Sequence, residues 1–357
     1  MKQIRNIQSL RGIAVLFVVF FHLFIIEQKY SGFDTFLPDA LQFGMFGVDL
    51  FFVISGFVMV TVTRGKFQNP KQAFMFLYNR ATRIYPLYWV YTILALTVFL
   101  IQPSWVNSSQ GNQVDILSSF LLLPSDKLPL VQVGWTLIHE IYFYLVYFLI
   151  LIFLPEKFLV YAIGGWGASV VLLNLYPLSG SPFYNLVFNP LTIEFMGGCL
   201  LAVIYHKSGI SKVSGRVLML GAGIALLLAI AGHTVYQNVS GTLPAGWWRV
   251  LLYGLPSLFI TYCAINAERT GFVFHSSLVQ TGNASYSIYL SHLFTINVIG
   301  RIWAMFSIPP LFDNVIAISV ALTSVLLVGF LSYMLVENAL LKLTRKAFPT
   351  SSVILPK

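Results

Sequence analysis

The 357-residue sequence has little charge and little cysteine. Asp, Glu, Lys and Arg make up 9% of the residues, whereas 57% are hydrophobic and the mean hydropathy is +0.81. These values exclude an ordinary soluble domain and indicate a polytopic membrane protein. The two cysteines, Cys199 and Cys263, lie in apolar runs, so neither a disulfide framework nor a thiolate metal site is predicted. The six histidines form no HExxH-like pair, and we expect no metal.

The first apolar run is followed by no signal-peptide cleavage site, so we expect it to be retained as a helix. The sequence also lacks internal repeats and low-complexity linkers. It therefore predicts one membrane domain over residues 1–345 and a short cytoplasmic tail over residues 346–357.

Long apolar windows are what the sequence has in abundance. About 20 apolar residues suffice for a helix to cross a bilayer. The predicted fold is therefore an all-α polytopic membrane protein with about ten transmembrane helices. The expected spans are 8–26, 43–62, 84–101, 133–154, 158–175, 190–206, 216–233, 249–266, 283–302 and 315–341. The apolar segment 117–124 is too short to cross.

The basic residues are distributed unevenly between the predicted loops. If both termini are cytoplasmic, 17 of the 21 Lys and Arg residues face the cytoplasm, as the positive-inside rule requires. This asymmetry predicts cytoplasmic termini and contacts with anionic membrane lipids. It also explains the net charge of +9 without nucleic acid as a partner.

The first span carries two polar side chains, Arg11 and His22, inside its apolar run. Eleven residues at about 100° each complete three turns plus roughly 20°, so both side chains share one helix face, about 16 Å apart along the axis. Ionisable groups within a span are costly and indicate function. The alternative interpretation is that His22 only hydrogen-bonds a neighbouring helix.

Three carboxylates on other spans are predicted to lie at the depth of His22, in the outer half of the membrane: Asp49, Glu140 and Glu194. A histidine with a carboxylate suits general-base catalysis. Asp49 and Glu194 also fit a second interpretation, in which each stabilises a helix N-terminus. His139, next to Glu140, points about 100° away and is predicted to contact another helix or to lie at the lipid interface.

At the cytoplasmic side, Arg80 and Arg83 precede the third span and would share one face of a helix, with Arg11 at comparable depth. Arginine forks suit phosphate, although positive-inside anchoring is the alternative. A phosphate site inside and a base outside, joined by the first helix, are what transferring a group from a cytoplasmic phosphorylated carrier would require.

Five motifs occur in the order in which one family of membrane enzymes carries them. They are Arg11 with His22; Phe51, Phe52, Ser55 and Gly56 in GVDLFFVISGF; Arg80 with Arg83; Trp135, Leu137, Glu140, Phe143 and Tyr144; and Ser285, Tyr289 and His292 in SYSIYLSH. On these motifs the sequence resembles the acyltransferase-3 family of integral-membrane acyltransferases, most closely its bacterial exopolysaccharide O-acetyltransferases.

The resemblance implies acetyl-CoA as co-substrate and a hydroxyl of a glycan or lipid-linked sugar as acceptor, in the bacterial cytoplasmic (inner) membrane. Polysaccharide-export machinery is a further expected partner. We expect His22 to be the catalytic base, with Glu140 or Asp49 holding its imidazole. The residues expected to bind CoA are Arg11, Arg80 and Arg83, and those expected to bind substrate are Trp135, Glu194, Ser55 and His292.

Several alternatives remain open at this point. His22 could instead act as a nucleophile and form an acyl-histidine, and the acyl group could be succinyl. Intramembrane charges also fit a transporter of an acyl donor or sugar without chemistry. A third reading is a non-catalytic subunit of a polysaccharide-export assembly.

Overall fold

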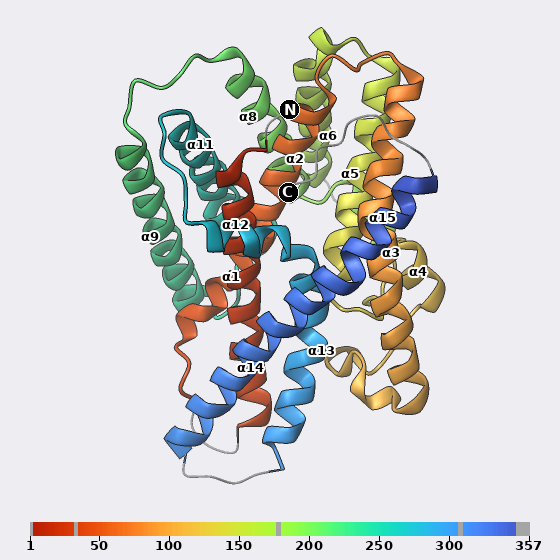
Figure 1. The fold of residues 1–357 in the computed structure, drawn as a ribbon, viewed down its shortest axis with the longest axis vertical. Helices are drawn as coiled ribbons and strands as arrows, with labels where there is room; N and C mark the ends of the chain where they lie inside the picture. Colours follow the sequence, from red (N-terminus) through yellow and green to blue (C-terminus); the bar gives the residue numbers. More distant parts are fainter. Residues whose placement is uncertain (1–2, 32–34, 176–179, 306–309, 348–357) are drawn as a thin grey trace. The chain divides into compact units, whose positions relative to one another are not determined.

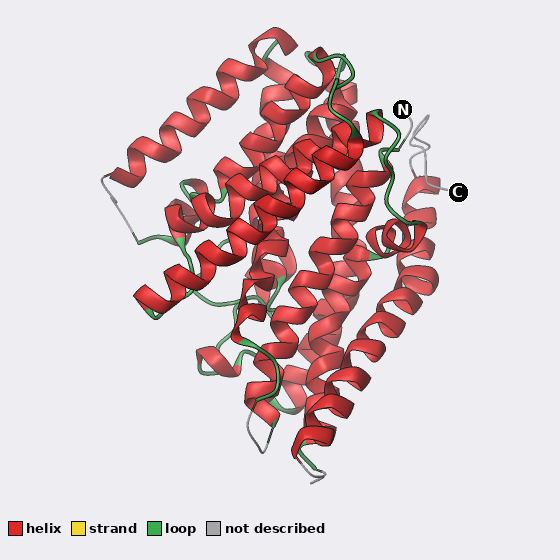
Figure 2. Ribbon diagram, turned by 90° about the vertical axis from the view of Figure 1, so that its left-hand side faces the viewer, coloured by secondary structure: helices red, strands yellow, loops and turns green. Residues whose placement is uncertain are grey.

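The computed structural model describes residues 3–31, 35–175, 180–305 and 310–347, which are helical for the most part and contain no strand (Figures 1 and 2). The predicted all-α polytopic membrane fold is confirmed. The cytoplasmic location of both termini stays a prediction, and the tail predicted over 346–357 lies outside the described residues apart from its first two positions.

Two compact units make up the chain, and the division falls inside helix α2 (Phe46–Thr63). The first unit contains Met1–Phe51 and Gly209–Asn338, and the second contains Phe52–Ser208 and Ala339–Val353, undescribed residues aside. Besides the start of α2, the helices of the first unit are α1 (Arg5–Tyr30), η1 (Asp39–Met45), α9 (Gly215–Ser240), α10 (Gly246–Arg249), the π-helical η5 (Val250–Gly254), α11 (Leu255–Arg269), α12 (Ser276–Asn283), α13 (Ser285–Trp303), α14 (Pro310–Ser332) and the π-helical η6 (Tyr333–Glu337).

The second unit continues α2 and holds the remaining helices. They are α3 (Pro70–Ile101), η2 (Pro103–Trp105), η3 (Ser108–Gln110), α4 (Ile116–Leu121), α5 (Gly134–Phe153), η4 (Glu156–Phe158), α6 (Leu159–Leu175), α7 (Pro182–Val187), α8 (Thr192–Lys207) and α15 (Asn338–Ala347), whose first residue belongs to the first unit.

Within the described chain, nine helices are long and apolar enough to cross a membrane, against the ten spans expected. The helix that falls short is α13, which occupies the place of the predicted ninth span but is too polar. Residues 284–292 are all buried, and α13 packs against α1 and α14 of its own unit. Its serines and histidine therefore meet protein rather than lipid, and the helix does not need an apolar surface.

The short apolar segment 117–124 contains the six-residue helix α4. Its last carbonyl groups lack partners within so short a helix. Side chains of α3 supply them: Tyr88 Oη donates to Ser119 O at 2.8 Å, and Trp89 Nε1 donates to Phe120 O at 2.9 Å. Tyr85 Oη likewise donates to Leu121 O at 3.0 Å. The aromatic run after Arg83 thus holds α4 against α3.

Helix α1 crosses α12 so closely that the two backbones touch. A Cβ atom at Gly12 would lie 2.6 Å from the carbonyl oxygen of Leu278, and one at Gly282 would meet the carbonyl of Gln8. Only glycine permits this approach, in the way that small residues let membrane helices pack.

Both ends of α1 are fixed by hydrogen bonds between carboxylates and backbone N–H groups. The carboxylate of Glu268 accepts from the backbone N–H groups of Arg5 and Asn6, at 3.0 and 2.7 Å, which satisfies two free donors of the first turn. At the other end, the buried Glu27 carboxylate accepts from the backbone N–H groups of Phe36 and Leu37, both at 2.8 Å. These bonds set the position of α1 along its axis.

A buried ion pair joins the start of α2 to α10. Arg249 Nε and Nη2 donate to the two carboxylate oxygens of Asp49, at 2.9 and 2.8 Å. Asp49 is 0% and Arg249 6% exposed. Such a fork is specific in geometry, and its loss leaves an uncompensated charge in the interior.

We predict that Glu268→Ala lowers the free energy of unfolding by about 1–2 kcal/mol, the usual cost of a lost N-terminal cap. Thermal unfolding in detergent measures this, with Glu268→Gln falling between wild type and alanine because one acceptor oxygen remains. Glu156→Ala is the matched control, since that carboxylate accepts one exposed backbone bond, from Gly65 N. An unchanged melting temperature in Glu268→Ala would show that α1 is not anchored there.

We predict that Asp49→Leu and Arg249→Met each destabilise the protein by about 3–5 kcal/mol, because each leaves one buried charge without its counter-charge. The double variant should recover most of this loss, since no charge then remains buried. Thermal unfolding of wild type, the two single variants and the double variant gives the coupling energy between Asp49 and Arg249. If the double variant loses the sum of the two single losses, the ion pair does not have the predicted role.

Candidate active site

The two polar residues predicted on the first span both lie on α1, which runs unbroken from Arg5 to Tyr30. The helical spacing that places Arg11 and His22 on one face therefore applies. Both side chains are half-buried. Because the ends of α1 are fixed, the depth of each side chain is fixed as well.

His22 contacts a second histidine that the sequence did not pair with it. Its Nδ1 lies 2.8 Å from the carbonyl oxygen of Val18 and 3.2 Å from Nε2 of His292. The two imidazole rings meet edge to face, with centroids 4.8 Å apart. His292, on α13, is 0% exposed, and its Nδ1 lies 2.7 Å from the carbonyl oxygen of Tyr289. The first unit thus brings two predicted site residues together.

The same buried stretch of α13 binds the carboxylate of Glu337, a residue of η6 that the sequence analysis did not predict for the site. Ser287 Oγ donates to Glu337 Oε2 at 2.6 Å, and both residues are buried. Glu337 lies inside the predicted span 315–341, so an ionisable residue within an apolar run was the signal that could have found it.

Asp49 has a different partner from the one predicted. Its carboxylate is bound by Arg249, and among the described residues it makes no hydrogen bond to His22. Asp49 also lies in the first turn of α2, where a negative charge is favourable. Its predicted hold on the imidazole is corrected by the geometry, which gives that contact to His292.

Glu140, on α5 in the second unit, is the centre of a small polar group. Ser55 Oγ donates to its Oε1 at 3.1 Å, and Tyr144 Oη donates to the same oxygen. The two residues from separate motifs, Ser55 and Glu140, are therefore in contact. His22 belongs to the first unit, and a role of Glu140 toward it stays a prediction.

Arg80 extends this group toward the predicted phosphate site. Its guanidinium lies over two aromatic rings, 5.7 Å from the centroid of Phe76 and 5.6 Å from that of Tyr144. Its buried Nε has no hydrogen-bond partner among the described residues. A cation held by aromatic faces with a donor to spare is suited to an anionic ligand. Arg83 follows one turn later on α3, as the spacing predicted.

The remaining predicted site residues of the second unit lie on α5 and α8. Trp135 is in the first turn of α5, and its carbonyl oxygen lies 3.0 Å from Nδ1 of His139. Glu194 is in the first turn of α8 and is 1% exposed. That position fits the helix N-terminus interpretation of Glu194, and its binding of substrate stays a prediction.

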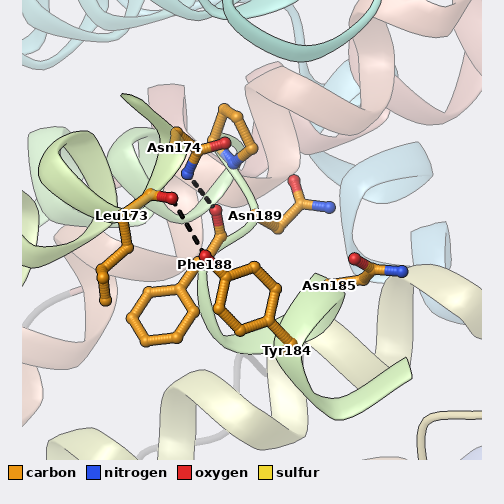
Figure 3. Close-up of a pocket in the computed structure, with 7 residues that line it drawn as sticks. Leu173, Asn174, Tyr184, Asn185, Phe188 and Asn189 are labelled. Carbon is orange, nitrogen blue, oxygen red and sulfur yellow. Dashed lines mark hydrogen bonds between the residues drawn. The ribbon is translucent and has the colours of Figure 1, made fainter. Parts of the chain in front are cut away.

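A cavity of about 270 Å³ lies in the second unit (Figure 3). Tyr184 Oη donates to Leu173 O at 2.9 Å, and Asn174 Nδ2 donates to Phe188 O at 2.7 Å across its wall. No predicted site residue is among those that line it, which are Leu173, Asn174, Tyr184, Asn185, Phe188, Asn189 and Pro190. We therefore place no chemistry there.

Comparison with known proteins places these residues in a family. The model of the acyltransferase-3 family, described as an acyltransferase domain, matches residues 4–334. The chain is 28% identical over 308 residues to the exopolysaccharide production protein ExoZ of Rhizobium meliloti, covering 84% of this chain and 90% of that protein. It is 25% identical over 389 residues to the acyltransferase MdmB of Streptomyces mycarofaciens, covering 97% and 94%.

The chain is also 23% identical over 382 residues to the O-acetyltransferase OatA of Staphylococcus aureus, covering 96% of this chain but 58% of that protein. No solved structure matches the chain significantly. The family model covers far more than half of the sequence, which confirms the resemblance drawn from the motifs. The chain therefore belongs to the acyltransferase-3 family and is a membrane acyltransferase.

Proposed function

We propose that the protein transfers an acetyl group from cytoplasmic acetyl-CoA to a hydroxyl of an exported polysaccharide or of its lipid-linked precursor. It would act in the bacterial cytoplasmic membrane, where the donor is available on the inner side. The observation that carries the proposal is His22, an ionisable side chain inside an apolar span whose ring is held by Val18 and His292. A histidine oriented in this way is suited to act as a general base.

The arginines support acetyl-CoA as the donor. CoA carries several phosphate groups, and guanidinium groups bind phosphate through paired hydrogen bonds. Arg80 offers a buried Nε without a partner among the described residues, and its guanidinium contacts the faces of Phe76 and Tyr144. Arg83 lies one turn further along α3. We infer that this pair engages the phosphates of CoA. A contact of Arg11 with CoA stays a prediction from the first motif.

The reaction follows from the chemistry of a thioester and a hydroxyl. Nε2 of His22 removes the proton of the acceptor hydroxyl as its oxygen attacks the acetyl carbonyl. The carbon–sulfur bond then breaks, and the CoA thiolate leaves and takes up the proton. The products are the O-acetylated acceptor and free CoA. In the alternative, His22 Nε2 itself attacks, and the acyl group passes through an acyl-histidine.

The relatives support a polysaccharide acceptor. ExoZ is named as an exopolysaccharide production protein and OatA as an O-acetyltransferase. We propose a glycan or lipid-linked sugar as the acceptor on this basis, with polysaccharide-export machinery and membrane lipids as partners. Trp135, Ser55 and Glu194 are the residues of the second unit that we propose to face this substrate.

We predict that His22→Ala lowers the rate of acetyl transfer by about 10²–10⁴-fold, the usual contribution of a general base. Purified protein, acetyl-labelled acetyl-CoA and crude cell-envelope glycan are the assay components, and both CoA release and label in the glycan are followed. Arg11→Ala should lose label transfer as well. His275→Ala is the control, because that exposed side chain only caps the start of α12.

The same assay separates the alternatives. Label trapped on wild-type protein and absent from His22→Ala would support the acyl-histidine route. If His22→Ala transfers label as fast as wild type, the catalytic role of His22 is wrong. Wild-type protein that moves acetyl-CoA or sugar across a vesicle membrane without turnover would make it a transporter.

We predict that Arg80→Ala and Arg83→Ala raise KM for acetyl-CoA by about tenfold or more, which corresponds to about 1.4 kcal/mol of lost binding. With S-acetylpantetheine, which lacks the nucleotide phosphates, both variants should match wild type. Lys71→Ala, an exposed cation at the start of α3, is the control. An equal rise in KM for acetyl-CoA and for S-acetylpantetheine would show that the arginines do not bind the phosphate groups of CoA.

A further inference from the structure

His292 is the buried titratable group that contacts the proposed base, His22. It lies on α13, 270 residues after His22, and its Nε2 faces Nδ1 of His22 at 3.2 Å. Within the described part of the chain its ring makes no hydrogen bond to a carboxylate, and Glu337 is bound by Ser287. The ring of His292 instead contacts the carbonyl oxygen of Tyr289 and His22.

The hydrogen-bond partners determine where the ring protons lie. A carbonyl oxygen can only accept, so the 2.8 Å contact with Val18 O requires a proton on Nδ1 of His22. For the same reason, the 2.7 Å contact with Tyr289 O requires a proton on Nδ1 of His292. In its neutral form, His292 then has a bare Nε2, which can accept from Nδ1–H of His22.

This arrangement leaves Nε2 of His22 unprotonated. That atom has no hydrogen-bond partner among the described residues, because both bonds to the ring fall on Nδ1. A bare Nε2 is the form that a general base needs. The Nδ1–H group is shared between Val18 O and Nε2 of His292, and both acceptors favour the same tautomer.

We propose that His292 is a positioning residue for the acetyl transfer, which accepts a hydrogen bond from Nδ1–H of His22 and thereby orients Nε2 and stabilises the imidazolium that forms there. When Nε2 takes the acceptor's proton, His22 becomes positively charged and its bond to His292 becomes charge-assisted and stronger. The proton leaves Nε2 again with the departing thiolate, so His292 is unchanged after each turnover.

A neutral side chain such as His292 is a suitable hydrogen-bond partner for His22 in the buried interior. A carboxylate beside His22 would stabilise the imidazolium more strongly, but it would bury a negative charge in the resting enzyme. His292 supplies a lone pair without that cost, since residues 284–292 are all buried. The inference deepens the proposed function and rests on it for its kinetic part, but the hydrogen bond itself does not.

Two substitutions separate the contact of His292 with Tyr289 O from its contact with His22. Asparagine places its amide near the position of Nδ1, so His292→Asn can keep the bond to Tyr289 O and loses the contact with His22. Glutamine places its amide near the position of Nε2, so His292→Gln can still offer an oxygen to Nδ1–H of His22. We expect His292→Asn to lower kcat by about 10- to 100-fold with KM for acetyl-CoA within about threefold of wild type. His292→Gln should keep kcat within several-fold.

Nitrogen-15 NMR of histidine-labelled full-length protein in detergent tests the hydrogen bond without any substrate. The signals are assigned with His22→Gln and His292→Gln. We expect a protonated Nδ1 and a bare Nε2 on both rings, with the Nδ1 signal of His22 shifted in His292→Asn but not in His233→Gln. His233 is a buried histidine of the same unit, bound to Tyr253 Oη at 2.6 Å.

The outcomes are distinguishable. A bare Nδ1 on His22 in wild type, or His292→Asn with the kcat of wild type, would overturn the inference. The expected tautomers together with a slow His292→Asn and a faster His292→Gln would support it. If wild type never turns over acetyl-CoA, the proposed function fails, whereas the NMR result still decides the bond between the two histidines.

Discussion

A polar group inside a bilayer has no water to bind, and it must find its partner within the protein. The first unit meets this requirement pair by pair: Asp49 with Arg249, Ser287 with Glu337, and His22 with Val18 and His292. Apart from the local contact of His22 with Val18, these contacts join helices that are far apart in the sequence. The positions of the functional side chains therefore depend on matched polar contacts as much as on apolar packing.

Helix α1 is fixed in position and carries His22, the proposed base. Glu268 caps its N-terminus, Glu27 near its C-terminus binds the backbone at Phe36 and Leu37, and Gly12 brings its backbone against α12. These contacts leave little freedom to slide or rotate, which is what a base of fixed depth needs. In the second unit one residue also makes two polar contacts, because Tyr144 donates a hydrogen bond to Glu140 and packs its ring against Arg80.

Much of the fold could be predicted from the sequence, because a bilayer demands long apolar windows and few other structures satisfy it. His22 and Arg11 stood out for the same reason, as costly residues in such a window. The partners could not be predicted. Arg249 lies 200 residues from Asp49, at the first position of the predicted span 249–266, and is buried against it. The contact of His22 with His292 spans 270 residues, and no local pattern encodes a contact of that range.

The polar character of α13 has a consequence for how the protein is made. A helix with so many serines and a histidine is a poor substrate for insertion into the membrane by itself. Its neighbour in sequence and in space, α14, begins a span with a hydropathy of 2.4. We expect the two helices to enter together as a hairpin during synthesis, with α14 carrying α13 into the lipid. His292 would then reach His22 only after this late step, so a nascent chain that stops before α14 would lack the contact between the two histidines.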